Sequence, residues 1–436
     1  MIKNEKAFAW GIVGIVLAVY MLIGNVMIGA EGRAEAPKME LTFLHAPGGK
    51  AAASPGYKGP VAGPTFWDAL TAPYLRAHPS VTVRHIDVDL STGSTLSMDA
   101  LVASGQAPDV YFDAPMRTAK YMVPEFALAL DGYATDWADY LPSVLDAVKR
   151  GGKIYAFPGW GWMTGMCLNL DLLAAAGASV PDDWTTGDFL VMAGKVKAKG
   201  KYATYLFAQD QSSDQWWMPW FAAFGARYYA PGDYSRSTLR SPQAVKALNF
   251  MKSLIDLGYV RPDAAATTDD DALADFQAGK VAAGSMQAAH IGTPSFKFRF
   301  VSFPHDTGVA GVGAAAGTSA AVVKASKDAE RNKAAADLAW TITGKDALTY
   351  VGYFTPGSYP SRKSVTDIGG QTEFDRQIQV IATRNGVLDM GIASPKFTAV
   401  RGLMFPLLQQ FYTGKMSAED VMKTYEAIVN KELEAK

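Results

Sequence analysis

Cysteine is almost absent from this sequence, because Cys167 is the single cysteine among 436 residues. One thiol excludes an internal disulfide and a cysteine zinc cluster. An excess of one charge is also lacking, since 41 basic residues stand against 42 acidic ones, and we find no block of lysine and arginine. Proteins that follow a phosphate backbone need such a block, so the sequence argues against nucleic acid as a partner.

Motifs of common enzymes and cofactor sites are missing as well. The chain contains neither GxSxG nor a P-loop, and its five histidines form no metal-ligand spacing. GVGAAAG at 311–317 approximates a dinucleotide loop, but a strand-like segment follows it where a helix would have to hold the pyrophosphate. Asp87 and Asp89 alternate as calcium ligands do, but Gly93 is misplaced for a calcium loop. The sequence therefore predicts no catalytic residue, no metal and no cofactor.

Long apolar runs are missing except at the start of the chain. Lys3 and Lys6 precede residues 7–30, which contain no charged side chain. A positive start followed by an apolar run predicts that residues 1–36 form an export signal or, if uncut, a membrane anchor. Ala34 and Ala36 offer a small-x-small cleavage site, and no cysteine lies near it, which excludes a lipoprotein. We expect a periplasmic or otherwise extracytoplasmic protein, either released by cleavage or tethered by this segment.

Strand-like and helix-like segments alternate from Met39 onward. Strand-like segments occupy 39–45, 81–90 and 108–113, of which 81–90 alternates with a period of two, and helix-like segments occupy 64–78 and 94–105. This β-α-β-α-β order predicts an α/β fold with a mostly parallel sheet, in which ligands bind beyond the carboxyl ends of the strands. The length of the chain predicts two such lobes rather than one.

A second series of elements follows the stretch PGWGWMTG at 158–165, in which glycine and proline bracket two tryptophans. We expect strands over 202–208, 281–286, 298–304 and 318–326, and helices over 180–200, 241–258, 269–280 and 328–343, with further helices after 397. The helix over 269–280 is expected to be capped by its own aspartates. No internal repeat and no low-complexity linker is found.

Five segments together resemble one protein family. They are GQAPDVYFD at 105–113, GKIYAFPGWGWMTGMCLNLDLL at 152–173, VPDDW at 180–184, DFQAGKVAAGSM at 275–286 and TSAAVVKASKDAERNKAAADLAW at 318–340. In order and spacing they resemble the extracellular solute-binding proteins of ABC importers, in the sugar-binding family 1 group that contains maltose-binding protein. Cys167 departs from the tyrosine that is frequent there, and Ala283 with Gly284 interrupts an Ala-Met pair.

The resemblance implies two α/β lobes with a ligand cleft between them and crossing hinge strands. Lobe one would comprise 37–160 and 304–350, and lobe two 161–303 and 351–436. It implies a monomeric, non-enzymatic protein that delivers a carbohydrate to the membrane permease of an ABC importer. Two alternatives stay open. A secreted carbohydrate-active enzyme would need paired carboxylates across the cleft, and an amino acid, peptide or polyol could replace the sugar, with Arg117 as the obvious cation for a ligand carboxylate.

Candidate ligand contacts follow from the chemistry of sugars. Sugar rings present C–H faces that suit aromatic platforms, and hydroxyls that suit carboxylates and amides. Asp210 and Trp216 are the strongest candidates that the resemblance implies, and Trp160 and Trp162 would line the crossing between the lobes. For each tryptophan the alternative is packing in a core, which we expect for Trp184, Trp220 and Trp340. The full set of candidates is Trp67, Asp113, Arg117, Trp160, Trp162, Asp210, Trp216, Trp217, Met286, Tyr353 and Phe354.

Overall fold

The computed structural model of the chain describes most of its residues. These are 39–46, 65–87, 94–209, 216–230, 233–287, 291, 294–353, 355, 357–370, 372–384, 387–389 and 391–435. The predicted export or anchor segment, 1–36, lies outside them. Among the helices within these ranges, none is both long and apolar enough to cross a membrane.

A parallel three-stranded unit forms the N-terminal end of the main sheet. β1 (Met39–His45) lies between β2 (Val81–Asp87) and β3 (Val110–Asp113) and runs parallel to both. α2 (Phe66–Ala77) and α3 (Ser94–Ala103) connect these strands. α2 begins with a capping box, in which the side chains of Thr65 and Asp68 accept from each other's backbone N–H groups. The predicted β-α-β-α-β unit is therefore confirmed.

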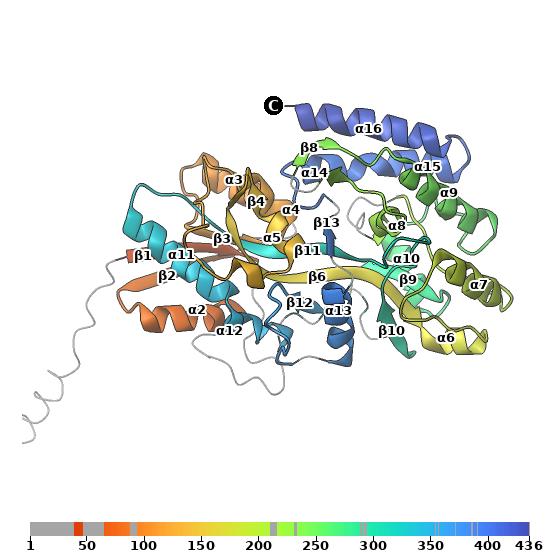
Figure 1. Cartoon of the computed structure of the whole chain (residues 1–436), viewed down its shortest axis with the longest axis horizontal. Coiled ribbons are helices and arrows are strands. Elements are labelled where there is room, and N and C mark those ends of the chain that lie inside the picture. Colours follow the sequence, from red (N-terminus) through yellow and green to blue (C-terminus); the bar gives the residue numbers. More distant parts are fainter. Residues whose placement is uncertain are drawn as a thin grey trace, which may run out of the picture.

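Two long antiparallel strands continue this sheet into the other half of the molecule. β11 (Gly313–Val323) pairs with β3 on one side and with β6 (Ala156–Asn169) on the other, so the strand order is β10-β6-β11-β3-β1-β2. β10 (Phe298–Val301), β9 (Ala283–Gln287) and β12 (Ser358–Pro360) also pair with β6, and β13 (Val387–Asp389) pairs with β11. Figure 1 shows β6 and β11 running between the two halves.

The remaining elements cover the two halves. The first half carries α4 (Pro115–Thr118), η1 (Ala119–Tyr121), η2 (Trp137–Asp139), α5 (Pro142–Ala147), β4 (Lys149–Arg150), β5 (Lys153–Ile154), α11 (Ala329–Thr343), α12 (Lys345–Leu348) and η5 (Val351–Tyr353). The second carries α6 (Leu170–Ala175), α7 (Thr186–Lys197), α8 (Met218–Ala223), β7 (Tyr229–Ala230), β8 (Asp233–Ser237), α9 (Pro242–Asp256), α10 (Asp269–Gln277), α13 (Glu373–Arg384), α14 (Phe397–Val400), η6 (Arg401–Met404), α15 (Phe405–Tyr412) and α16 (Ala418–Glu434). Figure 1 shows the first set around β1–β3 on the left and most of the second set on the right.

Two separate hydrophobic cores underlie these halves. One contains residues of β1, β3, α2 and α11, and the other contains residues of α7, α8, α9, α15 and α16. β6 contributes to both, since Phe157 and Trp160 pack in the first core while Met163 and Met166 pack in the second. Two cores joined by a shared strand support the two-lobed description. The lobe boundaries 37–160 with 304–350, and 161–303 with 351–436, stay a prediction.

Three sequence-based expectations differ from the structure. Residues 202–208 form no regular strand, because their backbone bonds to separate loop positions such as Tyr259 O and Thr267 O rather than to one neighbouring strand. The main sheet is not mostly parallel, because β6 pairs antiparallel with β9, β10, β11 and β12. GVGAAAG is not a loop throughout, since β11 begins at Gly313. The cap of α10 agrees with the expectation, because the Thr268 hydroxyl accepts from Asp271 N while Asp271 Oδ2 accepts from Thr268 N.

The glycines of β6 allow close approach of rings to the backbone. A Cβ on Gly159 would lie 2.8 Å from the ring of Phe112, one on Gly161 would lie 2.4 Å from the ring of Tyr359, and one on Gly165 would lie 2.5 Å from the ring of Phe300. None of these three glycines has a positive φ. Close packing therefore explains why glycine alternates with tryptophan here.

Gly161→Ala is expected to destabilise the protein, because the added methyl group overlaps the buried ring of Tyr359. Overpacking of this kind costs about 1–3 kcal/mol in unfolding free energy. Urea unfolding followed by circular dichroism measures the change. Gly132→Ala is the matched control, since a Cβ there meets no atom within 4 Å and the glycine needs no positive φ. Equal midpoints for the two variants would contradict the packing argument.

Candidate functional site

Trp162 is the partly exposed residue of the strand that joins the two cores. Of the fourteen residues of β6, Trp162 alone is not buried. Its neighbours in the sheet are Ser358 of β12 and Gly317 of β11. The indole belongs to neither hydrophobic core, although Trp160 and Met163 on either side do. The structure thus places a partly exposed aromatic residue on the strand that both cores share.

Trp67 and Trp160 lie together in the first core. Trp67 is 4% exposed and Trp160 is 5% exposed, and their ring centroids are 5.9 Å apart. The ring of Phe112 lies 4.7 Å from Trp160 and 5.1 Å from Trp67, while Phe66 contacts both indoles. The Trp67 indole N–H donates to the carbonyl of Ala46 at 2.7 Å. Both indoles therefore pack against aromatic neighbours, and ligand contact by either stays a prediction.

Asp113 and Arg117 neutralise each other at the carboxyl end of β3. Arg117 donates from Nε to Asp113 Oδ2 at 2.8 Å and from Nη2 to Oδ1 at 2.5 Å. Asp113 also accepts from the Tyr111 hydroxyl at 3.2 Å and from Ala114 N at 2.7 Å. Burial alone would lower the pKa of Arg117, but the hydrogen bonds and charge of Asp113 raise it. The carboxylate is occupied within the chain, whereas the Arg117 side chain remains 27% exposed and able to donate.

The candidates of the second half that the structure describes are buried. Trp216 is 3% exposed, Trp217 is 2% exposed and Met286 of β9 is 0% exposed. Trp217 lies between the rings of Phe221 at 5.9 Å and Phe405 at 5.7 Å, and its buried indole N–H finds no hydrogen-bond partner among the described residues. These side chains belong to the second core, so their contribution to a neighbouring site is packing beneath its surface.

The last candidates are placed only in part. Tyr353 ends η5, is partly exposed and lies against Gly369 and Gly370, where an added Cβ would come within 2.3 Å and 2.6 Å of its ring. Asp210 and Phe354 lie outside the described residues. The expected packing roles fit the burial of Trp184 and Trp220, which are both 0% exposed.

Arg150 joins the two halves and was not found from the sequence. Its Nη2 donates to the carbonyl of Ala393 at 2.6 Å, and its guanidinium lies 5.1 Å from the ring centroid of Tyr234. Nη1 donates to Lys149 O at 2.7 Å and Ala147 O at 3.0 Å, which fixes the side chain to its own half. α4 also contacts α14 here, and α5 contacts β13 (Figure 1). A charged residue in the turn KRGGK reads as an exposed turn residue, so no sequence pattern indicated this contact.

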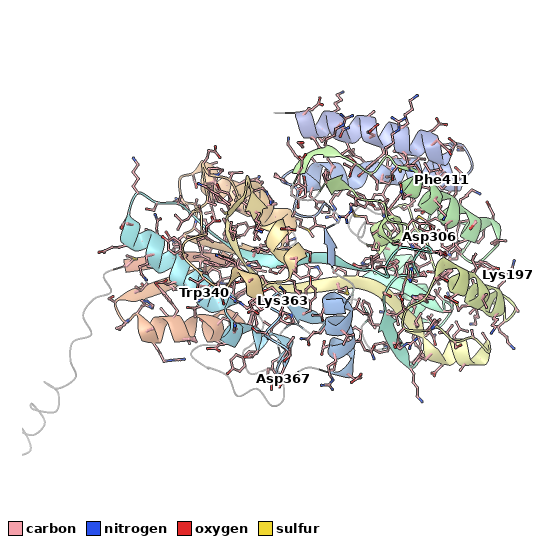
Figure 2. All side chains as sticks on the ribbon, viewed as in Figure 1. Lys197, Asp306, Trp340, Lys363, Asp367 and Phe411 are labelled. Carbon is pink, nitrogen blue, oxygen red and sulfur yellow. The ribbon has the colours of Figure 1, made fainter. Side chains whose placement is uncertain are left out.

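A buried arginine lies on the side of α2 and α12. Arg362 is 1% exposed, and its Nη1 donates to Asp136 at 2.6 Å while Nη2 donates to the Tyr140 hydroxyl at 2.8 Å. The guanidinium packs between the rings of Tyr140 at 4.2 Å and Trp340 at 4.6 Å. Trp340 is seen in Figure 2 beside the segment that contains Lys363. Trp340 thus packs on a buried cation, in agreement with its expected structural role.

Two surface cavities adjoin Arg362. One of about 580 Å³ lies between α2 and α12, and the other, of about 320 Å³, lies between the segment after β12 and α13. Neither is lined by any candidate residue from the sequence. Within the described ranges, no group of three or more His, Cys, Asp or Glu side chains could hold a metal ion.

Comparison with known proteins identifies the fold and the family. The sequence profile of a family described as bacterial extracellular solute-binding protein matches residues 69–379. No curated protein sequence matches the chain. Among solved structures, the cyclic alpha-maltosyl-1,6-maltose binding protein from Arthrobacter globiformis is 18% identical with a TM-score of 0.75, over 90% of this chain and 98% of that one.

Two further structures share the fold at similar identity. An ABC substrate-binding protein from Listeria monocytogenes in complex with cycloalternan is 18% identical with a TM-score of 0.66, over 92% of this chain and 100% of that one. The maltose-bound MalE3 of T. maritima is 19% identical with a TM-score of 0.65, over 91% of this chain and 99% of that one. These likenesses show a mixed α/β periplasmic solute-binding fold.

Proposed function

Because the chain belongs to the bacterial extracellular solute-binding proteins, we propose that it captures an oligosaccharide and delivers it to the permease of an ABC importer. The family is non-enzymatic and extracellular. The observation that carries the choice of a carbohydrate is Trp162, the one partly exposed residue of the strand that crosses between the cores. An indole face suits the C–H patches of a sugar ring.

The proposed site lies between the lobes and consists of residues that contact the ligand and of core residues that pack beneath them. Trp162 offers the platform, and Arg117, whose side chain is 27% exposed, offers donors for sugar hydroxyls. Trp67 and Trp160 support the site from the first core, and Trp216, Trp217 and Met286 support it from the second. Asp210, Tyr353 and Phe354 remain proposed contacts. The similar structures named with maltose, cyclic alpha-maltosyl-1,6-maltose and cycloalternan support an oligosaccharide of the maltose kind.

The alternatives from the sequence are less well supported. An amino acid or peptide needs an uncompensated cation for its carboxylate, but the charge of Arg117 is neutralised by Asp113. An enzyme would need a free pair of carboxylates, and the oxygens of Asp113 already accept from Arg117, Tyr111 and Ala114. We further propose that the protein is monomeric and that residues 1–36 direct its export or tether it.

A ligand screen tests the proposed function. The purified chain is heated with maltose, maltotriose, cyclic alpha-maltosyl-1,6-maltose, amino acids and polyols in turn. A ligand at about 100 times its dissociation constant stabilises the folded state by about 2.7 kcal/mol, which raises the melting temperature measurably. We expect a saccharide to do so at one per chain, with no product seen by chromatography. Stabilisation by amino acids alone, or release of cleaved sugar that Asp113→Asn abolishes, would refute the proposal.

A further inference from the structure

Two histidines lie in contact behind Trp67. His45 ends β1 and is 2% exposed, and the side chain of His85 on β2 is 25% exposed. His45 Nε2 and His85 Nδ1 are 2.9 Å apart. The ring of His45 stacks on the indole of Trp67 at 4.7 Å. The pair therefore touches an aromatic residue of the proposed site directly.

The hydrogen bonds determine where the protons of this pair reside. His45 Nδ1 lies 2.8 Å from the carbonyl of Ala46, which only accepts, so Nδ1 must carry a hydrogen. In neutral His45 the other nitrogen, Nε2, is then an acceptor, and His85 Nδ1 must donate to it. The same Ala46 carbonyl accepts from the Trp67 indole at 2.7 Å. One chain of hydrogen bonds thus connects His85, His45, the end of β1 and Trp67.

A first proton fits this chain, but a second does not. His85 Nε2 faces Asp68 Oδ1 of α2 at 3.9 Å, so a proton there leaves every hydrogen bond intact and gains a counter-ion. A second proton, on His45 Nε2, would make both rings positively charged. The N–H groups of His45 Nε2 and His85 Nδ1 would then point at each other across 2.9 Å and repel. Asp87 of β2 lies 3.4 Å from His45 Nδ1, but its side chain is 67% exposed and screened by water. β3, which pairs with β1 here through Phe112, presents no charge at this point.

The burial of the pair agrees with this proton count. The pKa of His45 is lowered from its ordinary value of 6.5 to about 4, chiefly by burial and also by the charge of His85, although the Ala46 carbonyl and the carboxylates of Asp87 and Asp68 raise it. Burial also lowers the pKa of His85, although the nearby carboxylates of Asp68 and Asp87 raise it in part. The pKa values of both histidines are lower in the folded protein than in the unfolded chain. The stability that the hydrogen-bonded histidine pair contributes is therefore fully present above about pH 6.5 and is lost as pH falls towards about 4.

We propose that His45 and His85 are positioning residues that hold Trp67 in place, and that acidification of the medium weakens ligand binding by forcing a second proton onto the pair. The effect reaches the site through contacts already described. Trp67 packs on Trp160 at 5.9 Å, and Trp162 lies two residues further along β6. The inference rests on the proposed binding function for its effect on affinity, but the rearrangement of Trp67 occurs without ligand.

His85→Gln is the variant that separates positioning from mere packing. A glutamine side chain donates to neutral His45 and, after rotation of its amide, accepts from protonated His45, while adding no charge. We expect the affinity of the unmodified chain for maltose to fall about tenfold between about pH 7 and about pH 4.5, and that of His85→Gln to change less than about twofold. His78→Gln is the matched control, because His78 lies at the other end of α2, bonded to Tyr74 O at 3.0 Å. This control should keep the pH profile of the unmodified chain.

Two measurements on ligand-free protein make the result independent of whether maltose binds. Nitrogen NMR of labelled histidines should show both rings protonated on Nδ1 at neutral pH, with His85 titrating before His45. Tryptophan emission should change over the same acidic range in the unmodified chain and in His78→Gln, but not in His85→Gln or in Trp67→Phe. An acid-induced change that persists in His85→Gln would overturn the proposal. So would a His45 that titrates near its ordinary pKa. Failure of maltose to bind would count against the proposed function alone.

Discussion

Trp162→Ala is expected to weaken binding of the confirmed saccharide about ten- to a hundredfold, which corresponds to about 1–3 kcal/mol. The stability of the ligand-free protein should change little, because the indole is partly exposed and packs in neither core. Isothermal titration calorimetry gives the affinity, and thermal unfolding without ligand gives the stability.

Trp160→Ala is the matched comparison, two residues earlier on the same strand. Its indole is 5% exposed and packs against Phe112 at 4.7 Å. Truncation of such a buried ring costs about 3–5 kcal/mol in unfolding free energy. We therefore expect Trp162→Ala to lose affinity for the saccharide and Trp160→Ala to lose stability. If Trp162→Ala unfolds early and still binds the saccharide normally, the indole is a packing residue and the proposed platform lies elsewhere.

Arg362→Ala should be among the most destabilising single substitutions in the chain. The guanidinium is 1% exposed, donates to Asp136 at 2.6 Å and packs between Tyr140 and Trp340. Its removal leaves the buried Tyr140 hydroxyl without this donor and empties the space between the two rings, whereas the Asp136 side chain is 35% exposed and can return to water. Loss of a buried hydrogen-bond partner costs about 1–3 kcal/mol, and the lost packing of the side chain adds to it. Urea unfolding measures the change. Arg362→Lys should recover little, since an ammonium cannot bond to both Asp136 and the Tyr140 hydroxyl while stacking between two rings.

Arg376→Ala is the control for this experiment. Arg376 of α13 pairs with Glu373 at 3.2 Å, but both side chains are mostly exposed, at 57% and 76%. Exposed pairs contribute about 0–1 kcal/mol, so the control should unfold close to the unmodified chain. Similar midpoints for Arg362→Ala and Arg376→Ala would mean that the buried cation contributes no more than a surface pair.

The elements with clear periodicity were predictable from the sequence, and so was their order. β2 alternates apolar and polar residues, β1 and β3 are short apolar segments, and α9 shows a helical stripe followed by Gly258, which has a φ of 66°. The segment at 202–208 is equally apolar, yet its backbone bonds to several separate positions, such as Tyr259, Thr267 and Lys280. The local hydrophobic pattern indicates which face of a segment can be buried. It does not indicate whether another strand will lie beside that segment and pair with it.

The location of the ligand site stays a prediction, and the surroundings of its candidate residues could not be predicted one by one. Trp160 and Trp162 occupy equivalent positions in a short repeat of Gly and Trp. Phe66 and Trp67 of α2 pack against Trp160, which is buried, whereas Trp162 stays partly exposed. Similarly, Arg117 and Asp113 were expected to face a ligand separately, but their spacing of four residues lets them bond to each other. A contact between distant segments decided the first outcome, whereas an ion pair between residues four positions apart decided the second.

The order of strands in the main sheet also affects how the protein is made. β3 needs β11 as its neighbour, with Val110 paired to Val323, and β11 in turn lies between β3 and β6. During synthesis, the ribosome therefore produces β1 to β3 and all of β6 long before the strand that joins them. Until Val323 has emerged, the nascent chain exposes an open sheet edge, which favours chaperone binding and aggregation over folding. A fragment that ends before Gly313 should accumulate as insoluble material, because β3 and β6 then lack the strand that pairs with both.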